Sequence, residues 1–91
     1  MFSFKKRGGI VVCSGQIETT FLAWEIKKIC NIPEGYEPKA SRTISSFVNV
    51  AGVGRIDAYG SDGDYPNQLY AMAINAITSN SIIFCISWET N

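Results

Sequence analysis

The sequence predicts an all-β fold, a small antiparallel β-sandwich, on three observations. Apolar and polar residues alternate in several short runs, which is the pattern of half-buried strands. β-Branched residues, which favour strands, are common in these runs. Clusters of Gly, Pro, Asn and Asp separate the runs at short intervals, as they do in sandwiches and barrels. The length of 91 residues predicts one domain spanning 1–91.

The first two predicted strands flank a proline-rich connection. "GIVVCSGQI" is rich in β-branched residues, and its alternate positions Val11, Cys13 and Ile17 are expected to face inward. "RTISSFVNV" is the next clear run, and it places three apolar side chains on one face: Ile44, Val48 and Val50.

Two further strands follow toward the end of the chain. "GRIDAYG" alternates Ile56 and Ala58 with Arg55, Asp57 and Tyr59, so the two sets are expected on opposite faces. "SIIFCISWET" has the clearest strand pattern. Its predicted inward face consists of Ile82, Phe84, Ile86 and Trp88.

Two segments fit helix as well as strand. "FLAWEIKKIC" carries Leu22, Ile26 and Ile29 at helical spacing, and its Ala, Leu, Glu and Lys favour helix. "QLYAMAINAIT" has the same ambiguity. An α+β fold with helices near 20–30 and 68–77 is therefore an alternative prediction.

The composition excludes several classes of function. Lys and Arg number 8 and Asp and Glu number 8, so the net charge is zero, which argues against nucleic acid as a partner. We interpret the one basic cluster, Lys5 to Arg7, as a solvated terminal segment. No histidine is present, which removes His-based catalysis and most zinc sites. We expect no metal and no cofactor.

The cysteines and the apolar runs point to a protein that folds in a reducing compartment. Cys13, Cys30 and Cys85 form no CxxC pair, so we expect free thiols packed as small apolar side chains. The apolar stretch Ile10 to Val12 is too short for a signal sequence, and no run is long enough for a membrane span. We expect no membrane insertion.

The connection "NIPEGYEPKA" has the features of a rigid crossover. Pro33 and Pro38 fix φ, Gly35 allows a turn with positive φ, and Tyr36 is suited to packing its ring. We assign these four residues a structural role and expect a link between two sheets. "IPEGYEP" resembles the "LPEGYRP" connection in the head domains of phage tail-fibre and baseplate receptor-binding proteins. The run "GIVVCSGQI" and the final "ISW" are also similar to that family, and the likeness extends from Lys5 onward.

The resemblance implies a function and its setting. Members of this family are non-catalytic, jelly-roll-like head domains that attach the virion to a saccharide on the host cell surface. It implies a homotrimer that contacts other tail or baseplate proteins and resides in the virion tail after synthesis in the bacterial host cytoplasm. A domain this small has a limited core, which independently favours an oligomer.

The stretch "RIDAYGSDGDY" is the predicted ligand site. Aromatic rings stack on the apolar faces of sugars, while carboxylates and guanidinium groups hydrogen-bond the hydroxyls. The candidate saccharide-binding residues are Arg55, Asp57, Tyr59, Asp62, Asp64 and Tyr65. Calcium is a weaker interpretation, because these aspartates lack the EF-hand spacing. Trp24 and Trp88 are predicted to lie in the core or at a subunit interface.

Two other functions compete with saccharide binding. The first is a structural trimerisation or capping domain of a tail fibre that has no ligand of its own. The second is a small cytoplasmic α+β interaction protein or small enzyme, which requires the two ambiguous segments to be helical. Glycoside hydrolysis by paired carboxylates is disfavoured, because nothing in the sequence places two of them across a cleft.

Overall fold

A computed structural model describes residues 2–48 and 52–90, and in these ranges the protein is all-β. The prediction of a small β-sandwich is confirmed, and the alternative helices near 20–30 and 68–77 are wrong. The described residues accordingly include no helix able to cross a membrane. The strands are β1 (Phe2–Arg7), β2 (Ile10–Phe21), β3 (Ile26–Asn31), β4 (Arg42–Val48), β5 (Val53–Tyr59), β6 (Gln68–Ala73) and β7 (Ile77–Glu89).

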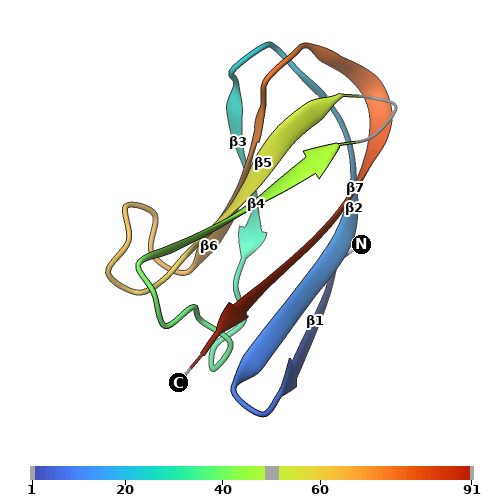
Figure 1. Cartoon of the computed structure of the whole chain (residues 1–91). Coiled ribbons are helices and arrows are strands. Elements are labelled where there is room, and N and C mark those ends of the chain that lie inside the picture. Colours follow the sequence, from blue (N-terminus) through green and yellow to red (C-terminus); the bar gives the residue numbers. More distant parts are fainter. Residues whose placement is uncertain (1, 49–51, 91) are drawn as a thin grey trace.

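The strands form two antiparallel sheets (Figure 1). The three-stranded sheet has the order β1-β2-β7, and the four-stranded sheet has the order β3-β6-β5-β4. Strands β4, β5 and β6 are joined by hairpins, while β3 reaches the far side of the sheet and pairs with β6. This arrangement is a Greek key, whose long connection runs from β3 to β4.

The core lies between the two sheets and follows the predicted alternation. Val11 and Cys13 on β2 are fully buried, and so are Ile56 and Ala58 on β5. The inward face of β7 is also buried as expected, with Ile82, Phe84, Ile86 and Trp88 between 0% and 4% exposed.

Strand β4 turns toward the core the face opposite to the one that its aliphatic residues predict. Ile44 points outward and is 54% exposed, while Phe47 is buried. Phe47 pairs with Gly54 across the sheet, and a Cβ atom at Gly54 would lie 2.6 Å from the Phe47 ring. The ring therefore occupies the space that the missing side chain leaves, and this fixes which face of β4 enters the core. Val48 has no described side chain, and Val50 lies outside the described residues.

The two ambiguous segments are strand–turn–strand units. Strand β2 ends at Phe21 and β3 begins at Ile26, with Trp24 between them at φ 66°. Positive φ is rare for a bulky residue, and here it turns the Trp24 side chain outward, where it is 65% exposed. Trp24 is thus outside the core of this chain, whereas Trp88 lies within it.

The proline-rich connection crosses the end of the sandwich. It links opposite edges of one sheet, so the expected link between two sheets is wrong in that respect. It nevertheless contacts the other sheet, because Pro38 bridges Thr90 and the Lys39 amide donates to the Glu89 carbonyl at 2.8 Å. Gly35 has φ 88°, in agreement with its predicted turn.

The side chains of the connection lock it to the core. Pro38 is buried, and the half-buried Tyr36 packs against the core cluster. The Trp88 indole Nε1 donates to the Tyr36 carbonyl at 2.7 Å, and the Thr90 hydroxyl donates to the Glu37 carbonyl at 2.6 Å. These contacts hold the motif against the end of the sandwich.

The three cysteines are free, but they differ in exposure. Cys13 is buried, Cys30 is half-buried and Cys85 is exposed. The expectation that each thiol packs in the interior is correct for Cys13 and wrong for Cys85, which occupies an outward-facing position of β7.

Thiol reactivity should follow this order. Burial raises the pKa of Cys13 from an ordinary value of 9.0 to about 12. We expect iodoacetamide at neutral pH to alkylate Cys85 in the folded protein and to reach Cys13 only on unfolding. Mass spectrometry measures the labelling, and equal rates at Cys13 and Cys85 would contradict the burial.

The folded Cys13 thiol keeps its proton more tightly than the unfolded one, so stability should fall as the pH rises above about 9. A Cys13→Ala variant should lose part of the alkaline dependence, because burial also raises the pKa of Cys30 and of Tyr59.

Candidate functional site

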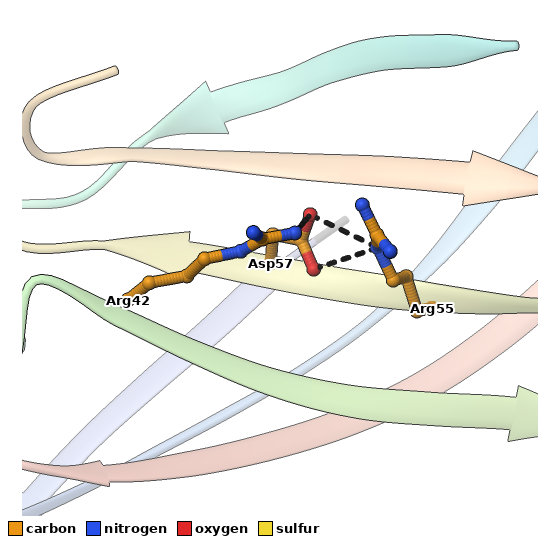
Figure 2. A network of polar contacts seen from close by, with 3 residues as sticks. All are labelled: Arg42, Arg55 and Asp57. Carbon is orange, nitrogen blue, oxygen red and sulfur yellow. Dashed lines mark hydrogen bonds and ion pairs between the residues drawn. The ribbon is translucent and has the colours of Figure 1, made fainter. Parts of the chain in front are cut away.

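The candidate site lies on the outer face of the four-stranded sheet and centres on Asp57. Asp57 is only 2% exposed, although its side chain points away from the core. Arg42 Nη2 donates to Asp57 Oδ2 at 3.0 Å, and Arg55 Nε donates to the same oxygen at 3.2 Å. Figure 2 shows the two guanidinium groups on either side of the carboxylate.

The group formed by Asp57, Arg42 and Arg55 has an excess of positive charge. Asp57 Oδ1 accepts no hydrogen bond and has an ion-pair contact of 3.2 Å with Arg55 Nε. One carboxylate thus faces two guanidinium groups, each about one-third exposed on its side chain (37% and 34%). Because each guanidinium has five N–H donors and Asp57 takes only one or two of them, both arginines retain donors for a ligand.

Three tyrosine rings lie beside the arginines. Tyr65 and Tyr70 have centroids 4.4 Å apart and an interplanar angle of 31°, which is close to stacking. Tyr59 meets both rings edge-on, at 5.3 Å and 5.9 Å. The Arg42 guanidinium lies 5.6 Å from the Tyr59 centroid.

The Tyr59 ring is the buried base of this group. It is 6% exposed, and burial, followed by the charge of Asp57, raises the pKa of its hydroxyl. Tyr65 is 44% exposed and Tyr70 is half-buried, so these two rings form the accessible surface.

The loop that carries Tyr65 is tied to the proline-rich connection. The Gly60 amide donates to the Ser41 carbonyl at 3.0 Å, and the Ile32 amide donates to the Asn67 carbonyl at 2.9 Å. The Ser41 hydroxyl also donates to Asp62 Oδ1 at 3.0 Å. The crossover motif therefore helps to position the loop, although it is not itself part of the ring and arginine surface.

The six predicted site residues fall into three groups. Arg55 and Tyr65 are accessible members of the cluster. Asp57 and Tyr59 belong to it but are covered by their neighbours, so they support the surface from below. Asp62 and Asp64 are exposed on the loop, and Asp64 is close enough to Arg42 for its charge to act on the pKa of that group.

Sequence reasoning missed Arg42 and Tyr70. Arg42 is the cross-strand partner of Tyr59, and Tyr70 is the partner of Asp57. Extending the pairing of β4 and β5 outward from their hairpin would have placed Arg42 beside Tyr59. No comparable signal was available for Tyr70 while its segment was ambiguous between helix and strand.

Two hollows of the described surface lie elsewhere. One, of about 770 Å³, follows the exposed basic segment Lys5 to Arg7 beside Tyr36. Another, of about 520 Å³, lies between Ile10, Lys39 and Glu89. Across residues 2–48 and 52–90, no three Cys, Asp or Glu side chains converge as a metal-binding group.

The cluster is chemically suited to binding. It offers an accessible pair of stacked rings, guanidinium donors and the loop carboxylates of Asp62 and Asp64. This combination suits a ligand that has both an apolar face and hydroxyl or acidic groups. In comparisons with known proteins, no family profile, no curated protein and no solved structure matches the chain.

Proposed function

We propose that this chain is a non-catalytic saccharide-binding module, the head domain of a phage-type receptor-binding protein that attaches the virion tail to a sugar on the host cell surface. The β-sandwich fold and the locked "IPEGYEP" crossover support this proposal, since both agree with the resemblance in the sequence. The proposed assembly is a homotrimer joined to other tail or baseplate proteins.

The observation that carries the proposal is the accessible ring pair beside two arginines. A pyranose packs its C–H face on an aromatic ring, and Tyr65 offers such a ring at 44% exposure. Arg42 and Arg55 are near enough to donate hydrogen bonds to the hydroxyls or acidic groups of the same sugar. Their position is fixed by Asp57, so little side-chain freedom is lost on binding.

A second candidate function is a structural capping or trimerisation domain of a tail fibre. It is favoured by one observation: the two hollows described above are not lined by Tyr65, Arg42 or Arg55. A module without a ligand would have no need of the accessible rings, so saccharide binding separates the two functions.

The test is binding to a panel of glycans and purified bacterial surface polysaccharides. We expect at least one to bind, and Tyr65→Ala to weaken its binding by about 10-fold or more through loss of the stacking surface. Tyr65→Phe keeps the ring and should bind nearly as the parent does. Ile83→Ser, an exposed change on the other sheet, is the matched control. Absence of binding across the panel, or equal binding by Tyr65→Ala, would contradict the proposal.

A further inference from the structure

A cluster of exposed apolar side chains covers one end of the sandwich. We call it the apolar end, and it consists of Leu22 (72% exposed), Trp24 (65%), Ile26 (51%), Ile74 (42%) and Val53 (36%). The backbone brings these residues together, because the Trp24 amide donates to the Ala73 carbonyl at 2.7 Å and the Ile74 amide donates to the Val53 carbonyl at 2.8 Å. Figure 1 shows the β2–β3 and β6–β7 connections side by side at the top.

The cluster is as large as the larger apolar patches of monomeric proteins. Its five side chains expose on the order of 500 Å² of apolar surface, near the upper end of what monomeric proteins show. With a polar rim, such a patch approaches the roughly 800 Å² that each partner contributes to a stable interface. Tryptophan is the residue type most enriched at the energetic centre of interfaces.

The backbone at Trp24 gives a second, independent indication. Its φ of 66° is a conformation that glycine adopts easily and tryptophan rarely does. The turn therefore holds a large apolar side chain in solvent at the expense of local strain. Strain of this kind persists where the displayed side chain has a use.

Lys27, beside the apolar end, is already engaged within its own chain. Lys27 Nζ donates to the Thr20 carbonyl, lies 5.2 Å from the Phe21 ring centroid and is 3.9 Å from Glu25 Oε1. This lysine is engaged within its own chain and balanced by Glu25, so it offers little attraction to anionic lipid headgroups. A second copy of the same chain presents an equally apolar surface.

The apolar end adjoins Arg55, which pairs with Met72 in the same row as Ile26, and it lies at the opposite end of the four-stranded sheet from the tyrosine cluster. Val53 begins β5 at the apolar end and Tyr59 ends it in the tyrosine cluster, six residues or about 20 Å away. Copies joined through the apolar end would leave each Tyr65 accessible. This geometry suits multivalent attachment, in which several weak sites act together.

We propose that the apolar end is the surface through which copies of this chain associate, with Trp24 at its centre. This proposal rests on the oligomer of the proposed function and names the residues that form its interface. It does not depend on the identity of any sugar.

The test is the concentration dependence of solution mass, measured by sedimentation velocity for the whole chain. We expect an oligomer that dissociates on dilution, and Trp24→Gly to weaken association by about 30-fold or more. Glycine relieves the strain at φ 66°, so this variant should form a folded monomer with an undiminished melting temperature. Ile83→Ser, which removes an equally exposed side chain (69%) from the other sheet, should leave the mass unchanged.

Three results would overturn the inference. They are a parent chain that stays monomeric, a Trp24→Gly variant that associates normally, and dissociation caused by Ile83→Ser. Vesicle binding by a monomeric parent that Trp24→Gly abolishes would reassign the surface to lipid. Failure of saccharide binding alone leaves the mass unaffected, so it is distinguishable from each of these results.

Discussion

Replacing Trp88 with alanine is expected to lower the free energy of unfolding by about 3–5 kcal/mol. Trp88 is 4% exposed, meets the Phe4 ring edge-on at 6.4 Å, and donates from Nε1 to the Tyr36 carbonyl at 2.7 Å. The change would therefore open a large cavity and release the crossover at the same time. Since small domains have only about 5–15 kcal/mol of stability, the variant should be partly unfolded at 37 °C.

Two variants separate the effect of the cavity from that of the hydrogen bond. Urea denaturation gives the unfolding free energy of the parent, Trp88→Ala and Trp88→Phe. Trp88→Phe fills most of the space but leaves the part-buried Tyr36 carbonyl without its donor, so it should lose about 1–3 kcal/mol. A loss below about 1 kcal/mol for Trp88→Ala would mean that the crossover is not anchored in this way.

Replacing Asp57 with alanine is expected to lower the free energy of unfolding by about 2–4 kcal/mol. Removing one partner of a buried ion pair costs about 3–5 kcal/mol when the remaining charge stays buried. Arg42 and Arg55 are each about one-third exposed and could turn toward water, which reduces the expected loss. The arginines beside the Tyr59 and Tyr70 rings would also lose the carboxylate that holds them in place.

Asp64→Ala is the matched control for this prediction. Asp64 is an exposed carboxylate a short distance along the chain, and its replacement should change stability by less than about 0.5 kcal/mol. Thermal unfolding of both variants gives the comparison. Equal stability of Asp57→Ala and Asp64→Ala would show that the arginine pair does not depend on Asp57.

The fold was predictable where the sequence pattern fits only one period. Strand β7 alternates without ambiguity, and its inward face lies in the core as expected. The β2–β3 segment was ambiguous because its apolar residues satisfy both helical and strand spacing. The tertiary pairing of Ile26 with Met72 decided that segment, and such a contact is not visible in local sequence.

The site residues that share one strand were predictable from the sequence, whereas those on neighbouring strands were not. Arg55, Asp57 and Tyr59 share one face of a single strand, so their grouping follows from alternation alone. The burial of Asp57 could not be foreseen, because it results from Arg42 and Tyr70 on neighbouring strands. The orientation of Ile44 escaped prediction for a related reason, since the cross-strand fit of Phe47 over Gly54 determines the facing of β4.

The measurement that tests saccharide binding most directly is an NMR titration of the isotopically labelled chain with the best glycan from the panel. The proposal predicts that shifts concentrate on the rings of Tyr65 and Tyr70 and on the Nε–H groups of Arg42 and Arg55. Shifts confined to the groove along Lys5 to Arg7, or to the apolar end, would contradict the proposed site.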